Sequence, residues 1–368
     1  MRCELALARF RLHPCWRSSI TWVSRTGRLP SELSAIRDRT PSIAKIACSH
    51  EAFSDPGSHI PELDLGASLR SVKRATFNVR LYGNTYTWCV SSPFDLDAYL
   101  GRIGYTGPRT ATLDTLEALH ALHPAAIPFE NLNPLLGWPV ALDVESLQAK
   151  LVAGGRGGWC YEHNTLFRHA LEALGFSVTS LGARVLWNTP PGSPVGARHH
   201  MLLLVDLGGT PYIADVGFGG NVLTAPLRLE PHILQPTPHE LHRLSPLDDG
   251  FILEASLNGE WRPLYRFTLE AQFPADYEVS NWYLGQHPSS FFRQMLISAR
   301  VTPEGRYALL NNALAIHRKN GTEKRHLASA AVLRSCLEVD MGLQLPESPE
   351  LAATLERVSH MPAVPGKS

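Results

Sequence analysis

The 368-residue sequence predicts an α+β fold. Up to about Gly175, apolar residues recur at helical spacing, which predicts an N-terminal helical bundle over residues 93–175. From 176 to about 280, short alternating runs bounded by Gly and Pro predict an antiparallel β-barrel-like domain. Residues 281–345 mix both patterns, so we expect a linker and a small C-terminal α/β domain there.

Residues 1–92 differ from the rest of the chain because they show little sustained periodicity. The first fifty residues contain nine Lys or Arg and three Asp or Glu. This composition resembles an organellar transit peptide. The alternative is a gene-model extension translated from upstream of the true start. We therefore expect 1–92 to be an extension outside the folded domains, and both interpretations stay open.

The helical bundle is predicted from capping residues and apolar spacing. Asp95 or Asp97 can cap a first helix, Thr112 begins a second, and Asp143 begins a third that ends near Val152. A fourth helix begins at about residue 160 and ends before Gly175, the residue type expected after a helix C-terminus.

A cysteine stands at the start of this fourth helix. Cys160 follows Gly157 and Gly158, which can adopt positive φ and leave the backbone open to close approach. The unpaired N–H groups and the dipole at a helix N-terminus favour a thiolate, which is the nucleophilic form of cysteine. The alternative interpretation is a buried structural cysteine.

The β domain is predicted from runs at 178–188, 200–207, 211–218, 251–257 and 260–268, with a Pro/Gly loop at 189–197. Gly208 and Gly209 predict a two-residue hairpin turn. This turn pairs Leu202 with Asp215, so His200 and Asp215 share one face of the sheet as diagonal neighbours. A turn centred on residues 207 and 208 would pair them directly, whereas a one-residue slip would separate them.

A thiolate nucleophile needs a base, and the base needs an orienting group. The pattern therefore predicts a cysteine-protease-like core in which Cys160, His200 and Asp215 form a triad. Taken alone, a strand histidine such as His200 is more often an ordinary core or surface residue.

After residue 281, residues Phe291 to Ala299 are predicted to be helical. Residues 307–310 and 313–317 are expected to form paired strands, followed by a helix from Ser329 to about Val339. Residues 346–368 contain four prolines and are expected to form a mobile tail.

Several motifs in this order resemble the arylamine N-acetyltransferase family. The central one is Arg156-Gly157-Gly158-Trp159-Cys160, followed by His200 and Asp215 at the family's spacing. The resemblance extends over about residues 94 to 345 through the segments 97–105, 127–132, 215–220, 274–279 and 287–290.

The resemblance implies roles for individual residues. Cys160 would accept the acetyl group, His200 would act as its base, and Asp215 would orient the histidine. Phe129, Val185 and Phe218 would line the pocket for the acyl group and the aromatic amine, although apolar residues at such positions are as often plain core. Arg156 and Glu130 would form a buried ion pair that supports the active-site loop.

The implied activity is ping-pong acetyl transfer from acetyl-CoA to an arylamine or arylhydrazine, with no metal. The CoA contacts are expected at Gly217, Gly219, Ser289 and Ser290. Residues 284–286, Leu-Gly-Gln, depart from the family's pattern next to those serines, which puts the hydrogen bonds to CoA in doubt. As a hypothesis, Arg198 and His199 attract the CoA phosphates.

Composition narrows the partners. The formal net charge is zero, which argues against nucleic acid, and no apolar run approaches the length of a membrane span. The six cysteines form no Cys-x-x-Cys pair, and no His-Glu-x-x-His motif is present. We therefore expect a reducing, cytoplasmic location, with organellar targeting by residues 1–92 left open, and the oligomeric state is not indicated.

Two rival functions need to be weighed. A cysteine hydrolase or transglutaminase-like enzyme would employ the same triad, but it needs an open groove, whereas Phe129 and Phe218 near the thiol favour a small closed site. An inactive binding scaffold would not need Cys160, His200 and Asp215 all intact.

Overall fold

The computed structural model describes the backbone of 21–22, 46–49, 77–82 and 85–90, and all atoms of 94–190 and 192–362. The chain divides into two compact units, Met1–Pro93 and Phe94–Ser368. In the first unit, β1 (Thr21–Trp22), β2 (Ile46–Ser49), β3 (Phe77–Tyr82) and β4 (Thr85–Val90) form an antiparallel sheet in the order β1-β2-β4-β3. The rest of the expected extension over 1–92 lies outside the described residues.

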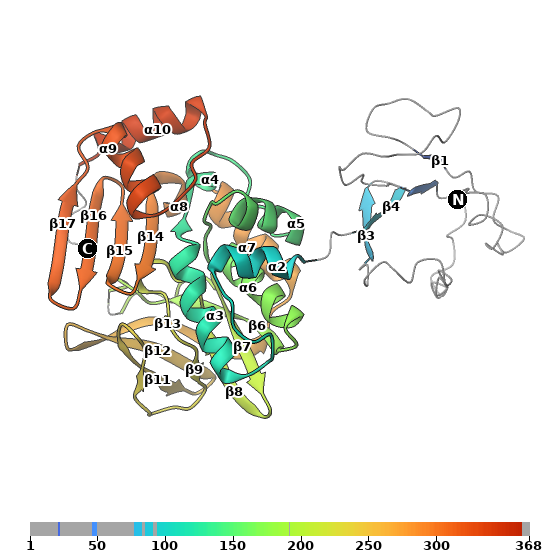
Figure 1. Cartoon of the computed structure of the whole chain (residues 1–368), viewed down its shortest axis with the longest axis horizontal. Coiled ribbons are helices and arrows are strands. Elements are labelled where there is room, and N and C mark those ends of the chain that lie inside the picture. The colour runs from blue at the N-terminus through green and yellow to red at the C-terminus, as the bar shows by residue number, and fades with distance from the viewer. Residues whose placement is uncertain are drawn as a thin grey trace, which may run out of the picture. The chain divides into compact units, whose positions relative to one another are not determined.

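The first helices of the second unit are labelled in Figure 1, and three of them begin at caps that the sequence predicted. Asp95 caps α2 (Leu96–Ile103), Thr112 caps α3 (Leu113–Ala126), and Asp143 caps α5 (Val144–Leu147), which continues as the π-helical turn η2 (Gln148–Ala153). The short α4 (Leu132–Leu135) precedes α5, and α6 (Cys160–Ala173) completes the group. Each of these three caps accepts a hydrogen bond from a first-turn N–H, which satisfies a donor that has no partner within the helix.

An antiparallel eight-stranded sheet follows, in the order β10-β11-β12-β13-β6-β7-β8-β9. Its strands are β6 (Ser177–Val185), β7 (His200–Leu207), β8 (Thr210–Ala214), β9 (Leu227–Arg228), β10 (Gln235–Pro236), β11 (Leu241–Leu247), β12 (Gly250–Leu257) and β13 (Glu260–Ala271). The Gln235 side chain bonds both the N–H and the C=O of Arg228, so it joins the two edge strands of this barrel-like sheet. The sequence did not predict β11, because Pro246 lowers the strand signal there.

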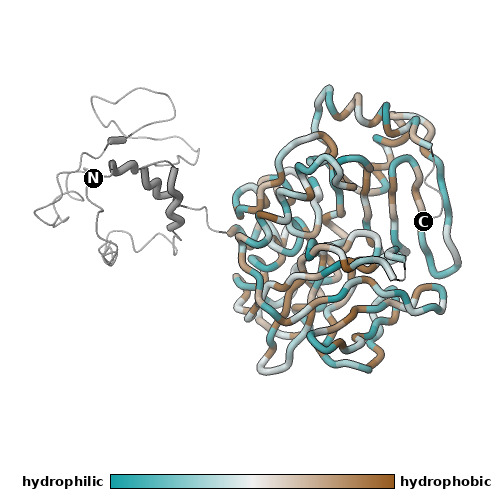
Figure 2. The backbone as a smooth tube through the Cα atoms, turned by 180° about the vertical axis from the view of Figure 1, so that it is seen from behind, coloured by the Kyte–Doolittle hydropathy of each residue, from teal (hydrophilic) through white to brown (hydrophobic). Residues whose placement is uncertain are grey.

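A five-stranded sheet runs in the order β17-β16-β15-β14-β5. It contains β14 (Ile297–Thr302), β15 (Gly305–Leu310), β16 (Ala313–Arg318), β17 (Gly321–His326) and the distant β5 (Phe129–Glu130). The paired strands expected at 307–310 and 313–317 are confirmed. Every residue of the edge strand β17 is exposed and most are polar, and Figure 2 draws this strand mainly in the hydrophilic colour, which discourages pairing with another chain.

The helix expected from Phe291 to Ala299 is wrong beyond its first turn. Helix α8 (Phe291–Gln294) is short, and β14 begins at Ile297. Strand β14 pairs with β15 on one side and with β5 on the other. These long-range hydrogen bonds override a helical pattern that is visible only locally.

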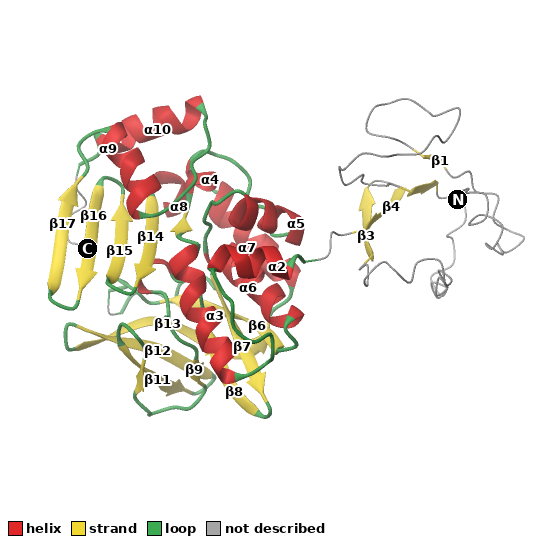
Figure 3. Ribbon diagram, viewed as in Figure 1, coloured by secondary structure: helices red, strands yellow, loops and turns green. Residues whose placement is uncertain are grey.

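The mobile tail expected over 346–368 is wrong for residues 349–359. There the chain forms α10 (Pro349–Ser359), capped by Ser348. Pro349 stands at the first helical position, where its missing N–H costs nothing. Leu351, Leu355 and Val358 are fully buried. The helix packs beside α9 (Ala330–Ser335) and the π-helical turn η4 (Cys336–Asp340) at the end of the five-stranded sheet, as Figure 3 shows.

Three apolar cores hold the second unit together. One lies among α2, α3 and α6, one inside the eight-stranded sheet, and one between the five-stranded sheet and its helices. Cys160 belongs to the first core and Phe218 packs against the second. Helix α7 (Pro274–Gln286) packs on the first core through Tyr277. The predicted site therefore lies where two cores meet.

Candidate active site

Cys160 is the first residue of α6, where the sequence predicted it. It is only 8 % exposed, and its thiol lies 3.9 Å from the His199 carbonyl oxygen. Gly157 and Gly158 do not have the positive φ that we expected. They are glycines because a Cβ on Gly157 would lie 1.9 Å from the Pro128 oxygen and one on Gly158 would lie 2.6 Å from the Glu162 carboxylate.

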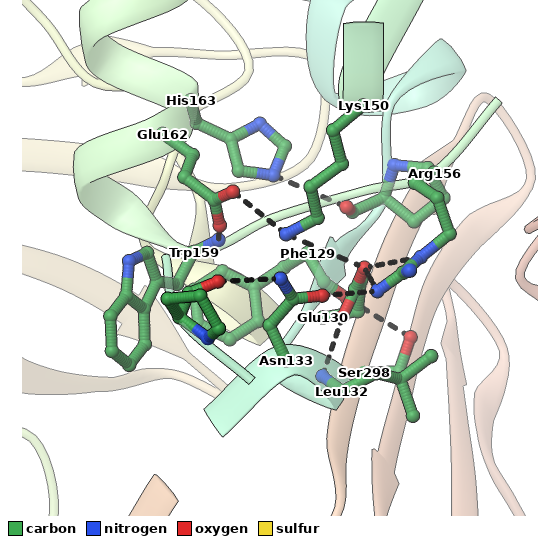
Figure 4. Close-up of polar contacts among 12 residues, drawn as sticks. Phe129, Glu130, Leu132, Asn133, Lys150, Arg156, Trp159, Glu162, His163 and Ser298 are labelled. Atoms are coloured by element: carbon green, nitrogen blue, oxygen red, sulfur yellow. Dashed lines mark hydrogen bonds and ion pairs between the residues drawn. The ribbon is translucent and has the colours of Figure 1, made fainter. Parts of the chain in front are cut away.

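A buried ion pair holds the loop before Cys160 (Figure 4). Arg156 donates from Nε and Nη2 to Glu130 Oε1 at 2.9 and 2.6 Å, and Nη2 also reaches Asn133 Oδ1 at 3.0 Å. Glu130 Oε2 accepts the N–H of Leu132 at 2.5 Å. Burial alone would raise the pKa of Glu130, but Lys150 and Arg156 hold it below its ordinary value. The expected ion pair is therefore present. Through Glu130 it joins the loop that carries Arg156 to the backbone at Leu132.

A second carboxylate fixes the start of α6 itself. Glu162 Oε2 accepts the N–H of Trp159 at 3.1 Å, and Oε1 accepts Lys150 Nζ at 2.7 Å, as drawn in Figure 4. Burial raises the pKa of Glu162, while Lys150 partly offsets that rise. The backbone on the N-terminal side of Cys160 is thus held by two carboxylates that share one lysine.

The hairpin between β7 and β8 has the predicted register. Leu203 pairs with Ala214 and Leu207 with Thr210, so the turn is centred on Gly208 and Gly209. His200 begins β7, and Asp215 follows the last residue of β8. Their side chains meet: His200 Nε2 lies 2.6 Å from Asp215 Oδ2. This bond leaves Nδ1 as the ring nitrogen available to Cys160.

The buried pair favours a charged imidazole. Burial by itself would lower the pKa of His200, but the Asp215 carboxylate and the neighbouring Cys160 side chain together raise it to about 10. Burial would raise the pKa of Asp215, but His200, Asn164 and the Gly217 N–H hold it below its ordinary value. An aspartate paired with an imidazolium is the arrangement that supports a thiolate nucleophile.

Two residues that the sequence analysis missed hold Asp215. Asn164 donates to Asp215 Oδ1 at 3.0 Å and to the Met201 carbonyl at 2.7 Å, and it is completely buried. His120 Nε2 accepts the N–H of Asp215 at 3.0 Å. Asn164 lies four residues after Cys160 on α6, and this i, i+4 spacing was a signal that both face the same side of the helix. His120 comes from α3 and had no such local signal.

Aromatic rings surround the imidazole. Phe218, predicted as a pocket residue, packs edge-on against His200 with ring centroids 4.9 Å apart. Tyr265, which the sequence analysis also missed, packs 5.0 Å from both His200 and Phe218 and is fully buried. These rings exclude water from the His200 and Asp215 pair, which strengthens its electrostatic attraction.

The other two predicted pocket residues lie on different elements. Phe129 is in β5, and its ring would lie 3.7 Å from a Cβ placed on Gly219. Val185 ends β6, where it pairs with Tyr265 and is half-buried. The structure thus brings Phe129 and Phe218 beside residues of the triad region, while Val185 approaches it through Tyr265.

The expected CoA contacts differ in how their polar groups are used. The Gly217 N–H donates to Asp215 Oδ1 at 2.9 Å, and a Cβ on Gly217 would lie 2.7 Å from the Cys160 Cα. Gly219 begins the 3₁₀ turn η3 (Gly219–Asn221) with φ of 62°. Ser290 is buried and donates to the Leu284 carbonyl at 2.6 Å, whereas Ser289 is exposed and bonds His287 Nδ1 at 2.8 Å. Ser289 is therefore better placed than Ser290 to donate to a phosphate.

Among the residues with described side chains, no group of three or more His, Cys, Asp or Glu is arranged to hold a metal ion. In the same part of the chain, no helix is long and apolar enough to cross a membrane. The described free cysteines are Cys160 and Cys336, both buried.

Comparison with known proteins identifies the family to which this chain belongs. The family model described as N-acetyltransferase matches residues 112–349. The arylamine N-acetyltransferase of Mycobacterium tuberculosis is 42 % identical over 270 residues, which cover 73 % of this chain and 95 % of that protein. This chain belongs to the arylamine N-acetyltransferase family. The enzyme of that name from Mycolicibacterium smegmatis is 46 % identical over 254 residues, which cover 68 % of this chain and 92 % of that protein.

Solved structures agree with this assignment. The arylamine N-acetyltransferase of Mycobacterium marinum in complex with CoA superposes with a TM-score of 0.70 at 42 % identity, covering 72 % of this chain and 99 % of that one. The M. tuberculosis structure gives a TM-score of 0.70 and covers 71 % of this chain and all of that one. The α+β fold predicted from the sequence is confirmed by these neighbours.

Proposed function

We propose that this protein is an acyltransferase that moves an acetyl group from acetyl-CoA to an arylamine or arylhydrazine through a cysteine thioester. One observation carries the proposal. A cysteine at a helix N-terminus stands beside a buried His200 and Asp215 pair in a chain that belongs to the arylamine N-acetyltransferase family. The relatives bear the name of this activity, and one solved relative holds CoA.

In the first half-reaction, the Cys160 thiolate attacks the thioester carbonyl. A sulfur–carbon bond forms to Cys160, the bond from the acetyl group to CoA sulfur breaks, and the CoA thiolate takes the proton of the His200 imidazolium. The raised pKa of His200 keeps this proton available at neutral pH. Asp215 fixes the ring through Nε2 so that Nδ1 faces the sulfur.

In the second half-reaction, the amine nitrogen attacks the acetyl-cysteine carbonyl. The new bond is an amide, the bond to Cys160 breaks, and neutral His200 takes a proton from the amine nitrogen. This returns the thiolate and imidazolium. Aromatic amines and hydrazines suit this step, because they stay unprotonated at neutral pH and can stack on aromatic residues. Phe129, Val185 and Phe218 are the proposed walls of the acceptor pocket.

The CoA contacts that we propose are Gly217, Gly219, Ser289 and Ser290. The glycines permit close approach to the backbone near Cys160, and the Ser289 hydroxyl is exposed. Arg198 would attract the CoA phosphates in competition with Glu270, with which it already pairs at 2.9 Å. An unchanged affinity for CoA in an Arg198→Ala variant would show that Arg198 does not contribute to CoA binding.

The proposal is tested by following acetyl transfer with 4-aminosalicylate or 5-aminosalicylate as acceptor. A ping-pong enzyme gives parallel double-reciprocal plots when both substrates vary, and it exchanges labelled CoA into acetyl-CoA without any amine. A hydrolase would instead release acetate at a rate that the amine does not change. Intersecting plots without exchange would contradict the proposal, and a protein that neither exchanges nor transfers would be an inactive scaffold.

A further inference from the structure

Three buried side chains form a hydrogen-bonded chain that the mechanism above does not use. Tyr99 Oη lies 2.8 Å from His123 Nδ1, and His123 Nε2 lies 2.9 Å from His163 Nδ1. His163 Nε2 then lies 3.2 Å from the Pro128 carbonyl oxygen. The three come from α2, α3 and α6, and none is more than 1 % exposed.

The end of this chain fixes where its protons are. The Pro128 oxygen can only accept, so His163 carries its proton on Nε2 and accepts on Nδ1. His123 must therefore donate from Nε2, and Tyr99 must donate to His123 Nδ1. Both imidazoles are neutral, since burial lowers the pKa of His163 to about 4 and that of His123 well below its ordinary value. One continuous direction of donation thus runs from Tyr99 to Pro128.

The chain ends beside the proposed acceptor pocket. The Pro128 oxygen also accepts the N–H of Gly158 at 3.3 Å, two residues before Cys160. The next residue, Phe129, lies parallel to His163, with ring centroids 6.3 Å apart and planes 3° apart. Figure 4 shows His163 directed at this carbonyl beside Phe129. His163 therefore bonds the backbone that carries Phe129 and lies parallel to the ring itself.

We propose that His163, held by His123 and Tyr99, is a positioning residue that sets the place of the Phe129 ring and thereby the affinity of the acetylated enzyme for its aromatic acceptor. This inference rests on the proposed function. It separates the two half-reactions. The His200 and Asp215 pair serves acyl transfer to and from Cys160, whereas the Tyr99–His123–His163 chain serves acceptor binding.

The test uses the full-length protein, acetylated beforehand with acetyl-CoA and freed of CoA, in single-turnover transfer to 5-aminosalicylate. His163→Leu removes the donor to Pro128 and the flat ring, and we expect the half-saturating amine concentration to rise about tenfold, the worth of a buried hydrogen bond. His163→Gln keeps a donor and an acceptor at matching positions without the ring, and we expect a smaller rise of about threefold. The rate of acetyl-enzyme formation should stay within about twofold of wild type.

Three further variants, at two positions, keep the test independent of folding. Tyr99→Phe removes only the distant hydroxyl, and we expect it to raise the same concentration about threefold if the three groups act as one chain. His169→Leu and His169→Gln are matched controls on α6, because His169 touches neither Pro128 nor Phe129, and they should leave acceptor binding unchanged. Thermal unfolding of each variant shows which changes follow from stability alone.

Some outcomes would overturn the inference while leaving the proposed function intact. Unchanged amine saturation in His163→Leu and Tyr99→Phe, with transfer by the wild type, would give the chain a purely structural role. Equal losses in both half-reactions would do the same. Failure of the wild type to acetylate any arylamine would instead overturn the proposed function.

Discussion

Asp215→Asn is expected to disable the site without changing its shape. Asp215 Oδ1 accepts two donors, Asn164 Nδ2 and the Gly217 N–H, and Oδ2 accepts His200 Nε2–H. An asparagine must keep its oxygen towards the two donors, so its NH₂ group faces His200 Nε2. His200 then has to accept on Nε2 and carry its proton on Nδ1, the nitrogen that faces Cys160. In that tautomer it cannot take the thiol proton.

The magnitude follows from the pKa of His200. A rise from 6.5 to about 10 corresponds to about 5 kcal/mol at about 1.4 kcal/mol per pKa unit. We expect the loss in the variant to be of this order, because burial opposes the rise in pKa while Cys160 contributes part of it. A loss of about 4 to 5 kcal/mol in the transition state lowers the rate by about 10³ to 10⁴.

The assay is the rate of CoA release on mixing enzyme with acetyl-CoA at pH 7.5. We expect the Asp215→Asn rate to fall by about 10³ to 10⁴, with thermal stability close to wild type. Asp206→Asn is a matched control, because Asp206 is exposed on β7 and its side chain accepts the turn N–H of Gly209, away from the triad. A loss of less than tenfold in Asp215→Asn would refute the reasoning about the tautomer.

Three predictions concern stability. Arg156→Met removes the guanidinium that donates two hydrogen bonds to buried Glu130 and leaves Lys150, at 3.9 Å, as the nearby cation. We expect the free energy of unfolding in urea to fall by about 3 kcal/mol, part of which Arg156→Met combined with Glu130→Gln recovers; no recovery would contradict the ion-pair account. Burial lowers the folded pKa of His120 and His163 to about 4, below the 6.5 of the unfolded chain. Each histidine therefore lowers the free energy of unfolding by up to about 1.4 kcal/mol per pH unit as pH falls from 6.5 towards 4; an equal free energy of unfolding in urea at pH 5 and pH 7 would be inconsistent with this. Removing residues 346–368 deletes α10 and should lower the melting temperature by several degrees, because three apolar side chains leave the core; an unchanged melting temperature would restore the expectation of a mobile tail.

Local signals in the sequence predicted the parts of the site that lie within one element or one hairpin. Thr112, Asp143 and Ser329 cap their helices as expected, because capping depends on the three residues that follow. The register of β7 and β8 followed from Gly208 and Gly209, since a two-residue turn leaves one pairing. This register carried His200 and Asp215 to the same place.

Long-range contacts were not predictable in the same way. Strand β5 pairs Phe129 with Ala299, far along the chain, and no local pattern reports such a partner. The sequence did not predict β14 or the role of His120 for the same reason, because each depends on a neighbour from another element. Helix α10 differs from the expected tail because proline at the first helical position, as at Pro349, favours a helix start, whereas several prolines in one segment also indicate disorder.

The central claim is that Cys160 carries the acetyl group between the two substrates. The most direct measurement is the intact mass of the protein after mixing with acetyl-CoA in the absence of an amine, for wild type and for Cys160→Ala. The account predicts a gain of about 42 Da in the wild type, lost on adding an arylamine, and no gain in the variant, as covalent catalysis requires. An adduct that persists in Cys160→Ala, or amide formation by a wild type that never gains this mass, would contradict it.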